Sequence, residues 1–377
     1  MTAAVERELR SFLPPGSVLD GTPAAYLADE TETRGVSGRA DAVVLPETVD
    51  EVAQVVAWCY EHGVGIVPRG GGTGFAAGAV PLSGGVVVAL ERLTRVRSFD
   101  PLLWRICVEA GLKTADLRRL VRESGLFFPP DPGAAEQSQI GGNIATNAGG
   151  PHAFKYGVTG AWVTGLEAVL PPGEIVSVGG AIRKDVAGYD LKALLVGSEG
   201  TLGIVTAAWL RLLPAPEASY PVAVFYPSVA AGCEAIEAVL GNGLAVAALE
   251  YLDGSTLQAA GPAFPAPVPC AFHSTASAQR PCPRGGRSRA AVVLLALLGP
   301  EGVLLLLTVN AGGSFVIEAV LPRRTVLVGP TAGEERVLAA NFDTAAGTTE
   351  DFTLSSGSLG GTGLLTVGDQ GTWSGGQ

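Results

Sequence analysis

The chain has 377 residues, 47% hydrophobic and 16% charged, so it is long enough for two or three domains with cores of their own. Its formal net charge of −11 argues against non-specific binding to nucleic acids or to anionic membrane surfaces. Five cysteines at scattered spacings favour reduced thiols in a cytoplasmic protein over a disulfide framework. The charged N-terminal segment predicts a helix over residues 2–10 and no secretory signal peptide.

The first long helix is predicted after Thr48. Thr48 and Glu51 have the spacing of a capping box, and apolar residues then recur at helical spacing as far as Cys59. Gly63 supplies a stop signal. Cys59 lies on the apolar face and is expected in the core. His62, in the last turn, is expected to cap the C-terminal end, where the helix dipole favours it.

Residues 42–46 are a short apolar run stopped by proline, and strands are predicted at residues 64–67 and 86–90. The first of these strands leads directly into Pro68-Arg-Gly-Gly-Gly-Thr-Gly74, a loop whose backbone N–H groups are well suited to a phosphate. A Rossmann fingerprint would continue from its glycines into a helix, but here residues 76–81 lead to another strand. A Walker loop would end in Lys-Ser or Lys-Thr, which is missing. Both of these nucleotide-binding classes are therefore excluded.

A second glycine-rich segment, Ile140–Gly150, is the most unusual stretch of the chain. Two strands between residues 95 and 110 and a helix over 114–123, capped by Thr114, are expected before it. Pro129–Gly133 is a proline-flanked rigid turn. Gly141 and Gly142 are expected to open a helix at Asn143 that aims free N–H groups at an anion.

The first domain is expected to end at Pro214–Pro216. Residues 162–178 predict a hairpin turning at Pro171-Pro-Gly173, and Lys184–Leu191 precede a buried helix or turn. A third glycine loop, Gly197–Gly203, leads into a strand that ends near Leu213. Three such loops within a 140-residue window indicate one large cofactor held from several sides.

A second region opens with a predicted strand at 222–226, a helix at 228–240 and a strand at 245–252. Residues 262–290 look like a loop or linker. The apolar runs 291–298 and 303–308 are too interrupted for a membrane span and predict two strands joined by a turn.

Residues 314–321 and 325–328 extend that pattern, and the chain from residue 347 is rich in Gly, Ser and Thr and is expected to fray. Two explanations of the region after about residue 262 stay open. It is either a divergent domain half, or a frameshifted, recombined or artificial C-terminus.

Five motifs occur in an order that resembles a known family: residues 68–74, 130–132, 140–150, 184–191 and 197–204. They resemble the FAD-binding domain of FAD-linked oxidases of the vanillyl-alcohol oxidase and p-cresol methylhydroxylase type. The D-type subunit of glycolate oxidase and D-lactate dehydrogenase look most similar. The likeness covers roughly residues 20–260, and the C-terminal third does not match.

The resemblance implies an α+β fold with a two-subdomain FAD-binding domain of mixed and antiparallel sheets with helices. We expect this domain at residues 1–216, with lobes of about 20–95 and 96–216. A partial or atypical α+β substrate cap is expected at 217–346, followed by a tail at 347–377.

The resemblance also implies which residues hold FAD. Some relatives attach the flavin to a histidine in the first loop; here Thr73 stands in that neighbourhood, so non-covalent FAD is expected. The cofactor-binding residues implied are Pro68, Arg69, Gly70, Gly71, Gly72, Thr73, Gly74, Gly78, Ala79, Pro130, Asp131, Pro132, Gly141, Gly142, Asn143, Thr146, Asn147, Gly149, Gly157, Val158, Glu199, Gly200, Gly203 and Ile204.

Several residues in these motifs and close to them have two interpretations. Arg69 contacts a phosphate or pairs with a carboxylate. Asp131 contacts the cofactor or only caps its turn. His152, beside the central loop, reaches the flavin or packs elsewhere. Tyr156 and Tyr189 are either ligand contacts or residues of the core or a domain interface.

The function implied is FAD-dependent oxidation of a small 2-hydroxy acid such as glycolate or D-lactate, by hydride transfer to the flavin. An electron-acceptor or iron–sulfur partner subunit is a possible companion. Relatives carry two cap segments whose histidines bind a divalent metal and take the hydroxyl proton. Both segments are missing here, and His273 is the only histidine beyond His152. The catalytic residues therefore stay unknown and no metal site is predicted. The alternative function is a catalytically silent FAD-binding subunit of a multi-subunit oxidase.

Overall fold

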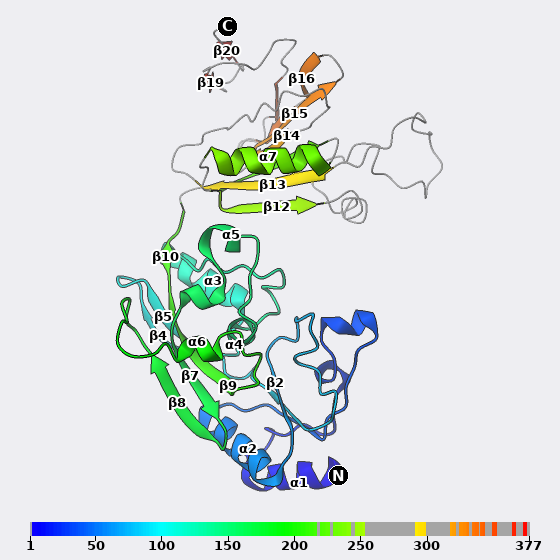
Figure 1. Ribbon diagram of the computed structural model, residues 1–377, viewed down its shortest axis with the longest axis vertical. Helices are drawn as coiled ribbons and strands as arrows, with labels where there is room; N and C mark the ends of the chain where they lie inside the picture. The colour runs from blue at the N-terminus through cyan, green and yellow to red at the C-terminus, as the bar shows by residue number, and fades with distance from the viewer. Residues whose placement is uncertain are drawn as a thin grey trace. The chain divides into compact units, whose positions relative to one another are not determined.

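The chain forms two compact units, Met1–Ala215 and Pro216–Gln377 (Figure 1). The computed structural model describes residues 2–216, 219–226, 229–242 and 246–252. Beyond these it describes only strand segments, at 291–298, 317–321, 324–331, 334–338, 340–343, 349–352, 364–366 and 372–374. The fold is α+β, with parallel and antiparallel sheets and helices, as the sequence predicts.

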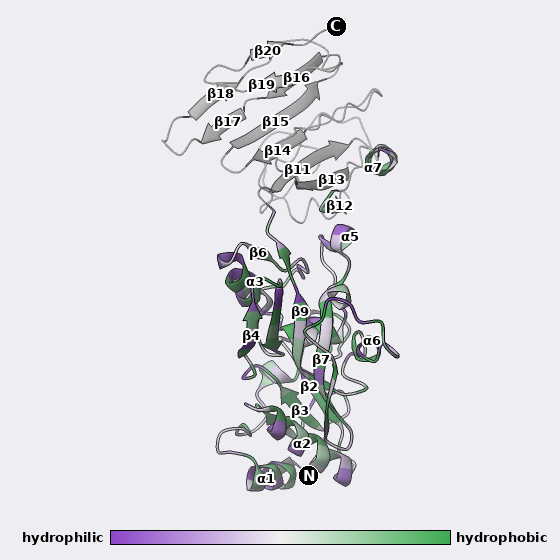
Figure 2. Cartoon of the chain, turned by 90° about the vertical axis from the view of Figure 1, so that its left-hand side faces the viewer, coloured by the Kyte–Doolittle hydropathy of each residue, from purple (hydrophilic) through white to green (hydrophobic). Residues whose placement is uncertain are grey.

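The first part of unit 1 is built on a small parallel sheet with strand order β1-β3-β2. Val86 to Ala89 of the central strand β3 are fully buried, and this strand is green, hydrophobic, in Figure 2. The elements are α1 (Thr2–Phe12), η1 (Ala24–Tyr26), η2 (Glu30–Arg34), β1 (Ala42–Val44), α2 (Val49–His62), β2 (Ile66–Arg69) and β3 (Val86–Ala89).

Helix α2 begins and ends as its sequence predicts. The Thr48 hydroxyl accepts a hydrogen bond from the amide of Glu51 at 3.2 Å, although the Glu51 carboxylate accepts from the amide of Glu47 and not from that of Thr48. Gly63 ends the helix in the left-handed conformation, with φ 63°. Cys59 is buried in the core, and burial raises the pKa of its thiol to about 12. His62 Nδ1 lies 2.8 Å from the carbonyl oxygen of Trp58, which confirms the C-terminal cap.

The second part of unit 1 is a five-stranded antiparallel sheet with order β4-β5-β9-β7-β8. The predicted hairpin is confirmed as the pair β7 and β8. A core of buried apolar residues lies between this sheet and the helices α3 and α4. The elements are β4 (Val96–Asp100), β5 (Arg105–Glu109), α3 (Thr114–Glu123), β6 (Leu126–Phe127), α4 (Ile140–Ala145), α5 (Ala153–Tyr156), η3 (Thr159–Trp162), β7 (Val163–Leu170), β8 (Glu174–Gly179), α6 (Lys192–Leu195), β9 (Ile204–Arg211) and β10 (Leu213–Pro214).

Two details of this part differ from the sequence prediction. Helix α3 spans the predicted residues, but Thr114 does not cap it. Its hydroxyl instead lies 2.8 Å from that of Ser138 and accepts a 2.6 Å hydrogen bond from Asn143 Nδ2. Helix α4 begins at Ile140 and not at Asn143. The buried side chains of Thr114, Ser138 and Asn143 thus tie α3 to the central glycine segment.

Unit 2 opens with the predicted strand, helix and strand: β11 (Ser219–Tyr226), α7 (Val229–Gly241) and β12 (Ala248–Leu252). An eight-stranded sheet with order β12-β13-β11-β14-β15-β17-β18, and β16 paired to β15, contains most of the remaining described strands. The predicted strand at 303–308 lies outside the described residues. The strands are β13 (Ala291–Leu298), β14 (Ile317–Leu321), β15 (Arg324–Thr331), β16 (Glu334–Leu338), β17 (Ala340–Asp343), β18 (Thr349–Phe352), β19 (Leu364–Thr366) and β20 (Thr372–Ser374).

Candidate functional site

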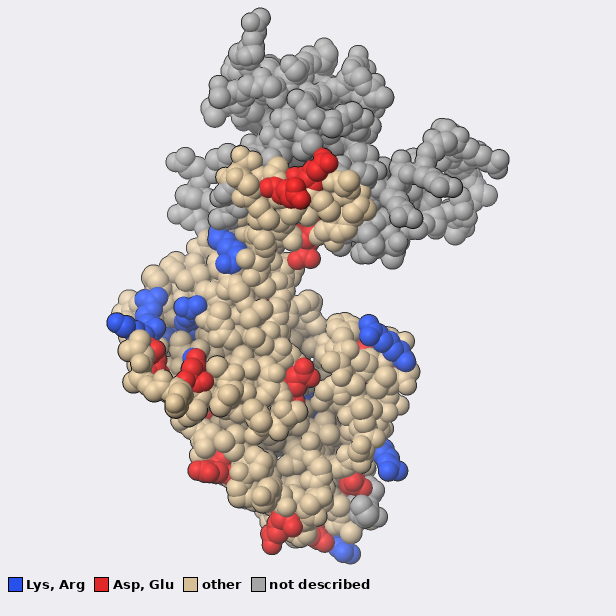
Figure 3. Space-filling view, viewed as in Figure 1, with Lys and Arg blue, Asp and Glu red and all other residues tan. Residues whose placement is uncertain are grey.

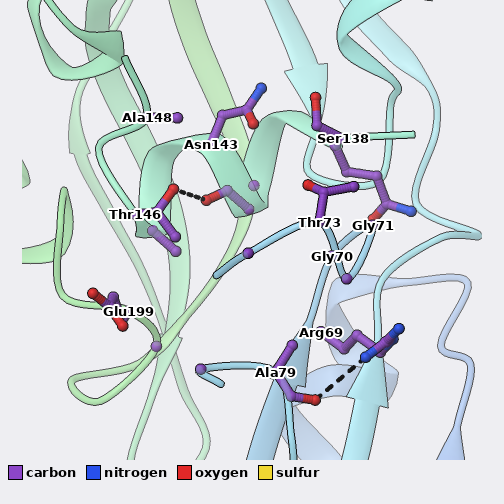
Figure 4. Close-up of a pocket in the computed structure, with 18 of the residues that line it drawn as sticks. Arg69, Gly70, Gly71, Thr73, Ala79, Ser138, Asn143, Thr146, Ala148 and Glu199 are labelled. Carbon is purple, nitrogen blue, oxygen red and sulfur yellow. Dashed lines mark hydrogen bonds between the residues drawn. The ribbon is translucent and has the colours of Figure 1, made fainter. Parts of the chain in front are cut away.

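Unit 1 contains a cavity of about 930 Å³ in which all three glycine-rich loops meet. The first loop comes from the end of β2, the central segment forms α4, and the third loop precedes β9. In Figure 4, Thr146 and Glu199 lie on one side of the cavity, and Gly70, Thr73 and Ala79 lie on the other. The space-filling view shows unit 1 hollowed on this face, where few charged side chains are visible (Figure 3).

The first loop offers a run of unused backbone donors to this cavity. Residues 70–74 all line it, and within the described part of the chain none of their five amide N–H groups donates a hydrogen bond to the protein. Successive backbone N–H groups in such a turn form a concave site for an anion. These half-buried donors have no acceptor among the described residues, so they are available to an acceptor that a ligand supplies.

The glycines of this loop are required by close packing as well as by the ligand. A Cβ on Gly71 would collide with the carbonyl of Gln137, and one on Gly72, which has φ 68°, would collide with the Arg69 guanidinium. Gly70 lies against α4: its Cβ would be 3.3 Å from the Cα of Gly142. Positions 71 and 72 of the loop therefore have room only for glycine.

Arg69 lies beneath the loop and donates its hydrogen bonds to the protein backbone. The residue is 8% exposed, and its guanidinium group donates to the carbonyl oxygens of Ala25 and Ala28 at 2.7 Å and of Ala79 at 3.3 Å. Burial lowers the pKa of Arg69, while the negative charges nearby act in the opposite direction. The side chain pairs with backbone carbonyls here, and neither of the two interpretations of the sequence anticipated this.

Helix α4 contributes fewer free donors than the sequence predicts. The amides of Ile140 and Gly141 donate to the carbonyls of Leu112 and Ala110, and that of Asn143 donates to Gln139. In the described residues, only Gly142 in this first turn has an amide without a protein acceptor. The first amides of α4 are therefore bonded mostly to the protein, and most of the unused donors belong to the first loop.

Two non-glycine residues of the cavity have left-handed backbone conformations. Asn147 has φ 47° and Glu199 has φ 52°. The Asn147 side chain accepts a 2.8 Å hydrogen bond from the amide of Gly160, and the amide of Glu199 donates to the carbonyl of Ala145. Such conformations cost free energy and concentrate at functional sites. The Glu199 hydrogen bond holds the third loop against the end of α4, and the Asn147 hydrogen bond holds η3 beside it.

Four of the residues predicted to bind the cofactor do not line the cavity: Pro130, Asp131, Gly157 and Val158. Asp131 instead pairs with His152, whose Nδ1 lies 2.6 Å from Asp131 Oδ2 and whose amide donates to Asp131 Oδ1. His152 also lies outside the lining, with its ring edge-on to Phe127 and Tyr156. The remaining predicted residues line the cavity together, and Tyr189 is exposed.

The cavity also includes residues that the sequence analysis missed, two of which carry an unsatisfied polar atom. Asp29 Oδ2 and Gln139 Oε1 are buried and have no hydrogen-bond partner among the described residues. The sequence indicated Gln139 only weakly, as the residue that directly precedes the central segment. The other missed lining residues are Glu30, Phe75, Ala76, Leu90, Gly133, Ala134, Ser138, Ala145, Ala148, Gly150, Ser198 and Val205.

These features fit a large ligand that combines an anionic group with polar groups of other kinds. Free amides suit a phosphate, and glycine surfaces suit a close approach. The charged lining residues are three acids, Asp29, Glu30 and Glu199, and one base, Arg69. Since the hydrogen bonds of Arg69 go to backbone carbonyls, the unused backbone amides of residues 70–74 are the donors available to the anionic part. No group of three or more metal-ligating side chains occurs in the described residues.

Comparison with known proteins identifies the kind of domain to which much of this cavity belongs. Residues 40–179 match the family described as "FAD binding domain". Glycolate oxidase subunit GlcD of Bacillus subtilis (strain 168) is 39% identical over 257 residues, covering 68% of this chain and 55% of the relative. D-lactate dehydrogenase of Anaerostipes hadrus is 37% identical over 228 residues, covering 60% and 48%. D-2-hydroxyglutarate dehydrogenase of Stutzerimonas stutzeri (strain A1501) is 36% identical over 205 residues, covering 54% and 44%.

The chain therefore spans about half the length of the curated relatives it matches. Among solved structures, alkyldihydroxyacetonephosphate synthase aligns with a TM-score of 0.64 at 22% identity, over 79% of this chain and 56% of that one. At this identity the likeness concerns the fold. In the described residues, no helix is both long and apolar enough to span a membrane. Residues 40–179 are an FAD-binding domain, FAD is its cofactor, and the chain around it is a relative of FAD-linked oxidoreductases that act on 2-hydroxy acids.

Proposed function

We propose that the chain binds FAD non-covalently and oxidises a small 2-hydroxy acid such as glycolate or D-lactate. The observation that carries the cofactor part is the run of five unused amides at residues 70–74, which line the cavity. The substrate part is supported by the relatives, which are named for glycolate, D-lactate and D-2-hydroxyglutarate. All three are 2-hydroxy acids.

Each part of the cavity has a separate task in this proposal. The amides of residues 70–74, with that of Gly142, hold the pyrophosphate, and Arg69 holds the loop from beneath. The small residues around Gly149 let a flat ring approach the backbone. Thr73 offers no imidazole for a covalent bond to the flavin. Bound FAD supplies a hydride acceptor for the substrate C–H bond.

A catalytically silent FAD-binding subunit is the alternative. It is favoured by the absence of a described histidine from the cavity lining, since neither His62 nor His152 lies there. Histidine is the side chain that most often takes a proton in catalysis. Under this alternative, FAD would bind in the same way, and a partner would supply the chemistry.

Two further points belong to the same proposal. An electron-acceptor or iron–sulfur subunit as partner is supported by the name of one relative, which is itself an oxidase subunit. A cytoplasmic location is supported by the buried free thiols of Cys59 and Cys107. Affinity purification from the native cell tests for the partner subunit, and cell fractionation tests the location.

The decisive experiment is an anaerobic titration of the purified full chain. Glycolate or D-lactate should bleach the visible flavin absorbance, whereas propionate, which lacks the hydroxyl group, should not. Flavin that stays oxidised until dithionite is added would support the silent subunit. A folded, colourless protein that ignores added FAD would contradict both readings.

A further inference from the structure

Asp29 carries a buried carboxylate oxygen that no group of the described protein satisfies. Its Oδ1 accepts from the amide of Thr31 at 2.9 Å and from the Thr31 hydroxyl, which makes Asp29 the N-cap of η2. Its Oδ2 has no hydrogen-bond partner, although the residue is only 6% exposed and lines the cavity. A buried carboxylate oxygen without a donor is unfavourable, so a donor from the ligand is expected there.

The nearest candidate within the protein does not supply this donor. Arg69 interacts electrostatically with Asp29, but its guanidinium hydrogen bonds go to the carbonyls of Ala25, Ala28 and Ala79. Arg69 thus offsets the charge of Asp29 without satisfying its oxygen. A carboxylate accepts hydrogen bonds and cannot donate them, so Oδ2 repels a phosphate oxygen and requires an O–H or N–H group.

The position of Asp29 beside the amide loop selects the kind of donor. A Cβ on Gly74, the last residue of the amide run, would lie 3.9 Å from Asp29 Oδ2. If the amides of residues 70–74 hold the pyrophosphate, then Oδ2 faces the groups bonded next to it. In FAD each phosphate is bonded to a CH2 group, and the hydroxylated carbons of the ribityl chain on one side and of the adenosine ribose on the other follow directly after it. The N–H groups of the flavin ring and of adenine are farther along the molecule.

We infer that Asp29 Oδ2 accepts a hydrogen bond from a sugar hydroxyl group of FAD next to the pyrophosphate, and so positions the cofactor. This inference needs FAD to bind but does not need the chain to turn over a hydroxy acid. It also accounts for the acid at this site: the charge of Asp29 is directed at a neutral hydroxyl group, while backbone amides receive the anion.

The test compares the native apoprotein with Asp29→Asn by titration with FAD, ADP and FMN. Asparagine is as good an N-cap as aspartate, so η2 is retained while the second acceptor oxygen becomes a donor. FAD affinity should fall about ten- to a hundredfold, the range of a hydrogen bond to a charged group. Glu32→Gln is the matched control: it removes an exposed charge from the same short helix, outside the lining, and should leave FAD affinity unchanged.

The fragments identify the sugar. If the ribose hydroxyl is the donor, ADP binding weakens in Asp29→Asn and FMN binding does not; if the ribityl chain is the donor, the reverse holds. Unchanged affinity for FAD and for both fragments would overturn the inference, as would a native protein that binds no FAD. If Asp29→Asn does not fold, Asp29→Ser keeps an N-cap oxygen, removes Oδ2 and must show the same loss. Normal FAD binding without bleaching by hydroxy acids would contradict the proposed activity and leave this inference intact.

Discussion

Gly72 lies directly against the guanidinium group of Arg69, so that a Cβ at position 72 would overlap Nη2 of that side chain. Gly72 also has φ 68°, a conformation that L-residues rarely adopt. The same glycine lines the cavity, and its amide has no hydrogen-bond acceptor among the described residues. One position therefore couples the buried arginine to the loop proposed to hold the pyrophosphate.

Gly72→Ala is expected to destabilise the apoprotein by about 1–3 kcal/mol, because of the left-handed backbone and the displaced arginine. It should also weaken FAD binding, since the amide run is distorted. Urea unfolding of the apoprotein and an FAD titration measure the two effects. Gly65→Ala is the control, because a Cβ there meets no heavy atom within 4 Å and φ is not positive. A Gly72→Ala protein as stable as the control would contradict the packing argument.

Arg69→Lys is expected to destabilise the apoprotein by about 2 kcal/mol or more, since lysine keeps the charge but cannot reach the carbonyls of Ala25, Ala28 and Ala79 at once. This loss of stability should be measurable in the apoprotein, without FAD. If the variant instead unfolds like the native apoprotein and binds FAD more weakly, with a reduced salt dependence, then Arg69 contacts the phosphate. That result would restore the first reading of its sequence motif.

The sequence indicated much of this site because glycine-rich segments are a local property. Three loops without bulky side chains in one window predict close backbone approach to a ligand, whatever the tertiary structure. The helix α2 was predictable for a similar reason: Thr48 and Gly63 act on their own neighbours. The order of the five motifs then specified the cofactor, which spacing within one loop could not do.

The parts that escaped prediction depend on contacts between distant segments. Asp131 was expected at the cofactor, but His152 captures its carboxylate. Thr114 was expected to cap its own helix, but its hydroxyl serves Asn143 and Ser138. Asp29 was missed because a short polar segment gives no sign of burial. In each case a polar side chain had several possible partners, and only the folded chain decides between them.

Glu167 is predicted to make the free energy of unfolding depend on pH in the acid range. It accepts hydrogen bonds from Arg97 at 2.9 Å and from the Thr206 hydroxyl at 2.8 Å. Burial raises the pKa of Glu167, but the hydrogen bonds and the charge of Arg97 outweigh it, so the pKa lies below the ordinary 4.5. Ionised Glu167 therefore stabilises the fold above that value, and the stabilisation is lost as the pH falls through the folded-state pKa.

Urea midpoints measured from pH 7 down to pH 3 test this prediction. Glu167→Gln should be less stable than the native protein at pH 7, and the difference should shrink at the acid end. Glu47→Gln, which removes an exposed carboxylate paired with Arg92, should show little pH-dependent difference. A constant difference between Glu167→Gln and the native protein over the whole range would rule out the ion pair as its cause.

Asp131→Asn tests whether Asp131, which lies beside the cavity, contacts the cofactor or only supports the packing of its own turn. In the structure, Asp131 holds His152, and a Cβ on Gly150 would collide with the Asp131 backbone carbonyl. Because Gly150 lines the cavity and Asp131 does not, Asp131 is expected to act through packing. The variant should lose about 1–3 kcal/mol of apoprotein stability by weakening the contact with His152, and FAD affinity should fall only a few-fold.

Asp116→Asn provides the matched control, since Asp116 pairs with Arg119 on the exposed face of α3 and should affect neither measurement. The comparison with Asp29→Asn is informative. That variant is expected to lose more free energy of FAD binding than free energy of unfolding of the apoprotein. If Asp131→Asn behaves in that way, with a large loss of FAD affinity and unchanged unfolding, then Asp131 contacts the cofactor. The proline-flanked turn would then have to move toward the cavity when FAD binds, carrying His152 with it.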